Sequence, residues 1–303
     1  MLTIIVCSRN SKLDESFSNN IDKTVGVIYE LICIDNSKNS YSIASAYEEG
    51  IQKSKFPYLI FVHEDVFFHT QDWGKKVIEH LQDPKTGILG LAGGDLATVV
   101  PAGWWSLNPI ENIIQSDQTK RNPTQYNCSF PDNNHALRSV VLLDGVLLCM
   151  RRNLFNHIKF DESLSGFHSY DYDISIQSIV AGFYNYVIFD ITVEHFSKGN
   201  MNRTYYSNLI KVFKKWEYQL PLIEHHIILE ANESLLSKLE EKNLLKLIKR
   251  LTRTGFSTKE IVDIVKYYAH LINSKKHLKC LKILRIRIIF IRISSFIRNK
   301  NNY

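Results

Sequence analysis

The stretch YLIFVHEDVFF, residues 58–68, places three consecutive polar side chains between two apolar runs. Its first apolar residues are typical of a buried β-strand, and His63, Glu64 and Asp65 stand where that strand would end. Adjacent carboxylates repel each other, and burying them unpaired costs free energy. This segment alone leaves two interpretations open: a charged turn that faces water, or a site where the carboxylates bind a cation.

The sequence around this stretch alternates between strand and helix signals. The strand-like runs are 2–8, 27–37, 58–68 and 87–94, and the stretches with helical spacing are 41–54 and 72–84. This alternation predicts an α/β fold, with a mostly parallel sheet and helices on both of its faces. Ligands of such sheets bind beyond the carboxyl ends of the strands. We therefore expect one crevice to be lined by Ser8-Arg9, Asp35-Asn36 and His63-Glu64-Asp65.

The middle of the chain is less regular. Residues 95–138 are long, polar and aromatic, which predicts a binding loop or lid. The run 139–152 indicates a strand pair or a bulged strand, broken at Asp144-Gly145. A helix is expected to begin near Asp171, and a last strand within 186–199. From residue 203 the pattern is helical, and STKE at 257–260 has the spacing of a helix capping box.

Charge is distributed unevenly along the 303 residues. Ten of the 37 Lys and Arg residues follow Asp263, the last acidic residue, so the other 27 are outnumbered by 31 Asp and Glu. The net charge of +6 therefore belongs to the tail. A domain that grips nucleic acid would carry this charge on its folded body. The pattern excludes nucleic acid as the expected partner and favours an anionic surface such as a membrane leaflet.

Cysteine usage and hydropathy indicate a cytoplasmic protein. The five cysteines form no CxxC pair, and an odd, unpatterned count is typical of a reducing compartment. The opening MLTIIVCSRN lacks the basic region of a signal peptide, and no window offers about 18 uncharged apolar residues. We expect neither a signal peptide nor a membrane-spanning helix.

Two acidic motifs are candidates for chemistry. At 63–65, carboxylate oxygens suit Mg²⁺ or Mn²⁺, which bridge substrate phosphates; the alternative is an exposed turn. In SYDYD, Asp171 and Asp173 are either a helix cap with a first-turn acid, or one of them is a general base for an attacking hydroxyl.

Two further features have both a structural and a functional interpretation. His195 follows an apolar run and is either a structural or exposed residue, or a third metal ligand. Trp104 and Trp105 could belong to a core. Neighbouring Pro, Gly and Ser favour a loop, where exposed tryptophans can stack on sugar rings. The sequence has no GxGxxG, no GxxxxGK[ST] and no GxSxG motif, which speaks against dinucleotide binding, a P-loop and a hydrolase nucleophile elbow.

Seven motifs in order carry a resemblance to a known family: CSRN, CIDNS with SIASAYEEG, FVHEDVFF, GLAGG, DGVLLCMRR, FHSYDYDISIQ and VEHFSKG. Together they resemble the bacterial GT-A glycosyltransferases, in particular a family-two-like group associated with capsule and other surface polysaccharides. The resemblance covers about residues 1–200. It implies a GT-A domain at 1–202, followed by a helical region with a basic tail at 203–303.

The resemblance also implies roles for individual residues. HED occupies the place of a DxD motif, so Asp65 would hold a Mn²⁺ or Mg²⁺ ion that bridges the donor diphosphate. His63 replaces the usual first Asp and could still reach the ribose, and His195 would complete the metal site. The implied donor-binding set is Ser8, Arg9, Asp35, Asn36, His63, Glu64 and Asp65.

On the acceptor side, the resemblance makes Asp171 the catalytic base, although Tyr170 replaces the usual Glu. The residues assigned to acceptor binding are Trp104, Trp105 and Asp144. Glu48 stands where relatives often have Asn. The implied reaction transfers a sugar from a nucleotide sugar, expected to be a UDP-sugar, to a hydroxyl of a glycan, glycolipid or glycoprotein, with inversion at the anomeric carbon.

Two other classes of function stay open. Because of His63, Glu48 and Tyr170, the chain could be a non-catalytic scaffold that binds sugar nucleotides within a polysaccharide assembly system. It could also be an adaptor that binds a membrane or nucleic acid through its tail. Residues 275–300 interleave nine Lys or Arg with Ile and Phe, which indicates either a packing or oligomer contact or a peripheral hold on anionic lipid at the inner face of the membrane.

Overall fold

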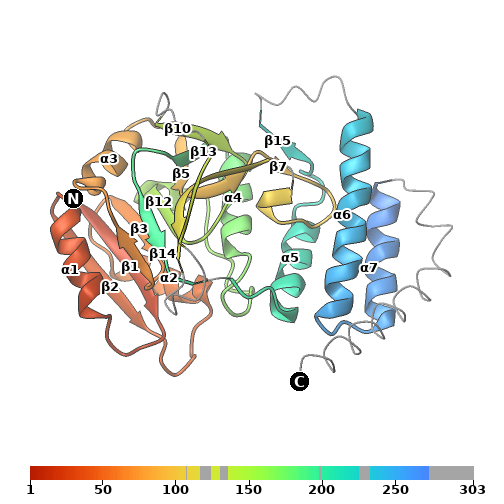
Figure 1. The fold of residues 1–303 in the computed structure, drawn as a ribbon, viewed down its shortest axis with the longest axis horizontal. Coiled ribbons are helices and arrows are strands. Elements are labelled where there is room, and N and C mark those ends of the chain that lie inside the picture. Colours follow the sequence, from red (N-terminus) through yellow and green to blue (C-terminus); the bar gives the residue numbers. More distant parts are fainter. Residues whose placement is uncertain (107, 117–123, 130–135, 198, 225–232, 273–303) are drawn as a thin grey trace.

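The computed structural model describes residues 1–106, 108–116, 124–129, 136–197, 199–224 and 233–272 (Figure 1). A central sheet forms one part of the molecule, and a group of helices lies beside it at the C-terminal end. The basic stretch 275–300, for which a membrane or oligomer contact was expected, lies outside the described residues.

The central sheet has seven strands in the order β10-β13-β5-β12-β3-β1-β2. Their bounds are β1 (Leu2–Ser8), β2 (Tyr29–Asp35), β3 (Tyr58–Val62), β5 (Thr86–Gly90), β10 (Leu137–Val140), β12 (Leu147–Arg151) and β13 (Tyr184–Ile188). Strand β1 pairs in parallel with β2 and β3, in a register that sets Ser8 opposite Asp35. The polar residues that follow these strands therefore share one edge of the sheet.

Helices cover both faces of the sheet, as the sequence predicts. Alternate residues of β1 point to opposite faces: Ile4 packs in one core with Phe17 of α1 and Trp73 of α3, whereas Ile5 packs in another with Tyr47 of α2. The helices are α1 (Glu15–Thr24), α2 (Ile43–Lys53), α3 (Trp73–His80), α4 (Tyr170–Val180), α5 (Arg203–Lys215), α6 (Glu233–Arg253) and α7 (Thr258–Leu271), with 3₁₀ turns η1 (Trp104–Ser106) and η2 (Arg152–Asn156).

The central sheet is mixed, whereas the sequence predicted a mostly parallel one. Strand β12 lies antiparallel between β3 and β5, and β10 lies antiparallel to β13, so three of the six pairings are antiparallel. The run 139–152 breaks at Asp144-Gly145, as expected, and yields β10, the short β11 (Leu142–Leu143) and β12. Strands β10 and β12 on either side of this break run in the same direction, and both are antiparallel to β13 and β5.

The segment 95–138, expected to be a loop or lid, contains strands of a second sheet. Its order is β11-β6-β8-β14-β4, with β9 paired to β8. The added strands are β4 (Val66–Phe68), β6 (Ala92–Gly94), β8 (Pro109–Gln115), β9 (Gln125–Cys128) and β14 (Val193–His195), and β7 (Leu96–Ala97) pairs with β15 (Leu222–Ile223). This second sheet brings β14 beside β4, so that His195 lies opposite Val66, the residue after Asp65.

The C-terminal helices share a hydrophobic core with α4. Tyr172 and Ile176 of α4 pack in the same cluster as Phe213 of α5, Leu247 of α6 and Val265 of α7. The capping box at Ser257 and Glu260 is confirmed, with both reciprocal hydrogen bonds present. The domain boundary between residues 202 and 203 stays a prediction.

No helix within the described residues is both long enough and apolar enough to cross a membrane. The four cysteines of the described part of the chain, Cys7, Cys33, Cys128 and Cys149, form no disulfide.

Candidate active site

The three polar residues after β3 point to different partners. Glu64 accepts hydrogen bonds from the Ser8 hydroxyl (2.5 Å) and from the Arg9 backbone N–H (3.1 Å). Glu64 therefore ties the end of β3 to the end of β1. The Arg9 guanidinium stays largely exposed, 3.6 Å from the same carboxylate.

His63 and Asp65 instead lie beside His195, the last residue of β14, which is distant from them in the sequence. Asp65 Oδ1 lies 3.5 Å from His195 Nε2 and 3.9 Å from His63 Nδ1. One ligand atom from each of these residues lies within 4.8 Å of the others. We call His63, Asp65 and His195 the metal triad.

The spacing and chemistry of the metal triad fit a divalent ion. Two ligand atoms each about 2.1 Å from one octahedral ion lie about 3.0 to 4.2 Å apart, and both measured distances to Asp65 fall in this range. Burial opposes ionisation of Asp65, but hydrogen bonds from His195 and Ser197 and the nearby imidazoles outweigh it and hold its pKa well below the usual value. Burial, with the neighbouring His195, lowers the pKa of His63, which keeps that imidazole neutral and able to ligate.

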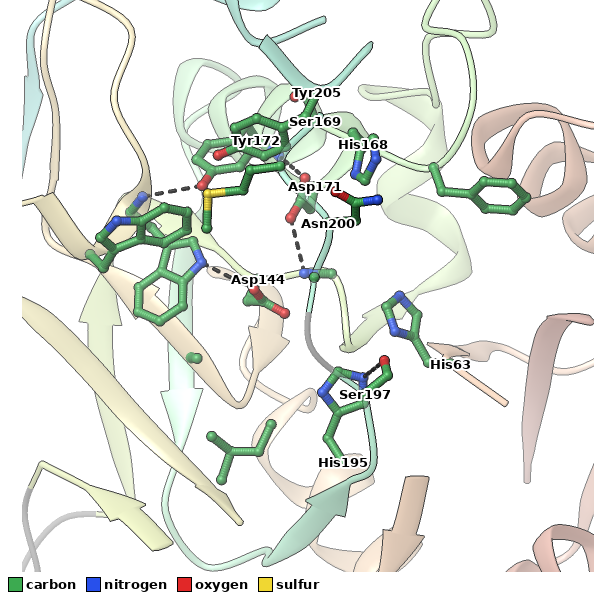
Figure 2. Close-up of a pocket in the computed structure, with 18 of the residues that line it drawn as sticks. His63, Asp144, His168, Ser169, Asp171, Tyr172, His195, Ser197, Asn200 and Tyr205 are labelled. Atoms are coloured by element: carbon green, nitrogen blue, oxygen red, sulfur yellow. Dashed lines mark hydrogen bonds between the residues drawn. The ribbon is translucent and has the colours of Figure 1, made fainter. Parts of the chain in front are cut away.

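Beside the metal triad is a cavity of about 250 Å³, lined by His63 and His195 and by three carboxylates, Glu111, Asp144 and Asp171. In Figure 2, Asp171 lies above Asp144, and His63 and His195 lie below and to the right of it. We call this space the catalytic cavity. Asp171 lies in the first turn of α4, where it accepts hydrogen bonds from the Gly145 N–H (3.0 Å) and the Tyr172 N–H (3.0 Å).

Asp171 has an unusual ionisation. Burial, followed by the charge of Asp144, raises the pKa of Asp171 to about 8, even though backbone N–H groups favour its charged form. A carboxyl group with a pKa near the working pH is suited to exchange a proton with substrate.

A close backbone contact explains why glycine follows Asp144. The Tyr170 hydroxyl donates to the Gly145 carbonyl (2.9 Å) and lies 3.4 Å from His63 Nε2. A Cβ at residue 145 would stand 2.2 Å from that hydroxyl. Ser169, just before α4, is held at a φ of 66°, a left-handed conformation that side chains rarely adopt. This strained entry to α4 places Tyr170 and Asp171 against the turn that carries Asp144.

The sequence model of a family described as glycosyltransferase-like matches residues 3–216. The chain belongs to this glycosyltransferase-like family. No curated protein sequence matches it.

Similarity to solved structures shows that this chain has the GT-A fold. It resembles S. aureus TarS 1-349 in complex with UDP-GlcNAc, with a TM-score of 0.54, 12% identity, and coverage of 97% of this chain and 91% of that one. The complex of the same protein with UDP gives a TM-score of 0.52, 14% identity, and coverage of 97% and 90%. GalNAc-T7 with UDP, GalNAc and Mn²⁺ gives 0.49 at 12% identity, and 56% of that chain is covered.

The expected donor residues of this glycosyltransferase family member divide into two groups. Arg9, Glu64 and Asp65 line a second cavity of about 720 Å³, and none of the three lines the catalytic cavity. Asp35 and Asn36 do not line either cavity. Asp35 is exposed and accepts from the Ser37 N–H, and Asn36 is buried, with its amide bonded to the backbone of Tyr41.

The two tryptophans of the expected acceptor site differ from each other. Trp104 is only 9% exposed, its indole N–H donates to Asp144 (3.1 Å), and it contributes to the wall of the catalytic cavity. Trp105 is 40% exposed and lines the catalytic cavity. Asp144 lies on the cavity wall, held by Trp104 and by the Val146 N–H (3.0 Å).

Asp173, the second acid of SYDYD, points away from the catalytic cavity. It is fully buried and contacts Lys215 (2.9 Å), the Trp216 indole N–H (2.7 Å) and the Gln177 amide (2.7 Å). These contacts brace α4 against the end of α5.

Sequence reasoning missed two residues that support the metal triad. The Ser197 hydroxyl lies 3.2 Å from His195 Nε2, and Gln115 Oε1 lies 3.4 Å from His195 Nδ1. Ser197 stands in the polar turn after His195, which offered a signal. Gln115 offered none, because only the pairing of β8 with β14 brings it close.

Proposed function

We propose that this protein transfers a sugar from a nucleotide-sugar donor to an acceptor hydroxyl, with metal assistance and with inversion at the anomeric carbon. One observation carries the proposal: two imidazoles of the metal triad, His63 and His195, line the same cavity as Asp171, a carboxyl group with a raised pKa. Membership of the glycosyltransferase-like family supports the reaction class. The TarS complexes with UDP and UDP-GlcNAc support a UDP-sugar as the donor.

The donor would lie across the metal triad. The catalytic cavity opens on one side of it and the cavity of about 720 Å³ on the other, and Ser197 lines both. The larger cavity would take the nucleoside, with the exposed Arg9 close to the phosphates. The diphosphate would then stand at the junction, and the sugar would enter the catalytic cavity.

His63, Asp65 and His195 would hold the ion, and their chemistry favours Mn²⁺ over Mg²⁺. Imidazole nitrogens suit transition metals, whereas Mg²⁺ prefers oxygen ligands. A bound divalent ion would neutralise the negative charge of the departing nucleoside diphosphate.

Asp171 acts as the general base in this proposal. Its carboxylate takes the proton of the acceptor hydroxyl, the hydroxyl oxygen bonds to the anomeric carbon, and the bond from that carbon to the diphosphate oxygen breaks on the opposite face. Asp144 raises the basicity of Asp171 and also offers an acceptor for sugar hydroxyls. The half-exposed Trp105 presents an apolar ring to the acceptor. In this proposal the transferred sugar is a hexose, and the acceptor hydroxyl belongs to a glycan, a glycolipid or a protein.

The test uses a panel of UDP-, GDP- and dTDP-hexoses with Mn²⁺, Mg²⁺ or EDTA. Binding is followed by calorimetry, and transfer or slow hydrolysis by release of the nucleoside diphosphate. We expect a UDP-sugar to bind with Mn²⁺ and to lose affinity in EDTA. Binding without turnover toward any acceptor would support the non-catalytic scaffold instead, and an absence of any nucleotide binding would overturn the proposal.

A further inference from the structure

A third cavity of about 300 Å³ lies between the loop that carries Trp105 and the helices α5 and α6. It is not part of the site described above, but Trp105, Met201 and Tyr205 line both it and the catalytic cavity. The two spaces therefore share a wall. We call this third space the basic groove because of its lining.

Four cations of α6 line the basic groove: Lys246, Lys249, Arg250 and Arg253. They recur at helical spacing along one stripe of α6, which spans about two turns, or about 10 Å. The groove has no acidic residue in its lining. All four side chains are exposed, and within the described residues none forms an ion pair with a carboxylate.

The helix dipole accounts for only part of this stripe. Cations in the last turn of a helix are stabilising, which suits Arg250 and Arg253. Lys246 lies two turns from the end, where the dipole contributes little. Asn243, one turn earlier, adds a buried Oδ1 that has no hydrogen-bond partner within the described residues. A hydroxyl or amide of a bound molecule would satisfy this oxygen.

We infer that the basic groove binds phosphate groups of the acceptor while the acceptor hydroxyl reaches Asp171. This inference rests on the proposed function, because it assigns the acceptor's chemistry at the same site. Unpaired cations that concentrate in a groove attract multiply charged anions, and the guanidinium groups of Arg250 and Arg253 can each form two parallel hydrogen bonds to phosphate. A neutral glycan would not need them. Trp105, on the shared wall, would contact the sugar or polyol between the phosphate and the reacting hydroxyl.

The ligand chemistry could come from two sources: a soluble chain linked by phosphodiesters, or a diphosphate that links a sugar to an isoprenoid. The test measures both with the full-length protein, without divalent metal, and with calorimetry as the readout. The probes are a short glycerol phosphate oligomer and a water-soluble isoprenyl diphosphate. Vesicles with and without phosphatidylglycerol form a third arm.

The variants are double substitutions, chosen to separate the effect of the groove cations from the effect of a lower net charge. Arg250→Gln with Arg253→Gln removes two cations of the groove, and Lys246→Gln with Lys249→Gln removes the other two. Lys238→Gln with Lys242→Gln removes the same charge from exposed positions of α6 outside the groove lining. We expect at least one probe to bind, each groove pair to weaken it tenfold or more, and the control pair to leave it within twofold. Circular dichroism melting checks that every variant is folded.

Transfer assays complete the test. With an acceptor that carries phosphate, the groove pairs should raise the acceptor KM tenfold or more and leave kcat and the donor KM unchanged. If a probe binds in the groove but no transfer occurs, the proposed function fails and the groove assignment stands. If transfer occurs with an acceptor KM that the groove pairs do not change, the groove assignment fails alone. Binding to anionic vesicles with no binding of either soluble probe would assign the cations to a membrane and overturn the inference.

Discussion

The metal triad and the neighbouring wall of the catalytic cavity each hold a carboxyl group, and the two groups have opposite pKa shifts. On the β3 side, Asp65 stands beside two imidazoles and the Ser197 hydroxyl, and its pKa lies well below the usual value. On the α4 side, Asp171 is buried beside another carboxylate, and its pKa rises to about 8. Environment alone therefore separates a carboxylate suited to a cation from a carboxyl group suited to proton transfer.

Replacement of Asp171 by Asn tests the proton-transfer side and has the largest expected effect. A general base contributes about 10² to 10⁴-fold to the rate, so Asp171→Asn should lower kcat by about that factor. Donor affinity should stay the same, because the metal triad is intact. Steady-state kinetics and calorimetry measure the two quantities. Normal turnover of this variant would remove Asp171 from the mechanism.

Replacement of Asp65 by Ala tests the cation side. Loss of this ligand should weaken Mn²⁺-dependent binding of UDP by about 100-fold or more, since even supporting residues of metal sites contribute 10 to 100-fold. The control is Glu64→Gln, which changes the adjacent carboxylate that braces β1 and β3. Calorimetry with and without Mn²⁺ distinguishes the two. Equal losses in both variants would mean that Asp65 has no special role in metal binding.

The Asp173→Asn variant sharpens the comparison between neighbours on α4. Asp173 forms a buried ion pair with Lys215, so its neutralisation should lower the free energy of unfolding by about 2 kcal/mol. The value of kcat should change little, because Asp173 does not line the catalytic cavity. Urea denaturation and turnover measure these effects. A stable but inactive Asp173→Asn variant would reverse the roles of the two acids.

The smallest expected effect is a change in pH dependence. Asp171 works only when ionised, so kcat/KM should rise with pH and level off above about pH 8. Asp144→Asn removes the neighbouring negative charge, which should favour ionisation of Asp171 and move the rise to lower pH by about one pH unit. The measurement is a pH profile of kcat/KM for both proteins. A rise that stays in place would show that burial alone sets this pKa.

Local signals in the sequence predicted much of the fold. The apolar runs of β1, β2 and β3, the break at Asp144-Gly145 and the capping box at Ser257 depend on neighbouring residues, which a sequence displays directly. The antiparallel entry of β12 was not predictable, because strand periodicity is the same in both directions. Strands β8 and β9 were also missed, since polar residues such as Glu111 and Asn112 in β8 and Asn127 in β9 interrupt their apolar pattern.

The site was predictable only in part, because some of its contacts join segments that are far apart in the sequence. Each of the His63, Asp65 and Asp171 positions could be found from its own motif, but no local pattern shows that His195 approaches Asp65 across paired strands. Trp104 is buried and Trp105 is exposed because Trp104 is the one that reaches Asp144, and no local pattern shows this. The basic groove needs α6 to pack beside the Trp105 loop, a contact between segments more than 100 residues apart.

The brace between Asp173 and the pair Lys215 and Trp216 limits how evolution or an engineer could recombine this protein. A chimaera joined between residues 202 and 203 would inherit α4 from one parent and α5 from the other. Asp173, which is itself fully buried, would then lose its matched cation and indole donor, and this is costlier than a mismatch between two surface residues. A chimaera that exchanges acceptor specificity should therefore take α4 and α5 from the same parent, with the crossover placed in the loop before Ser169.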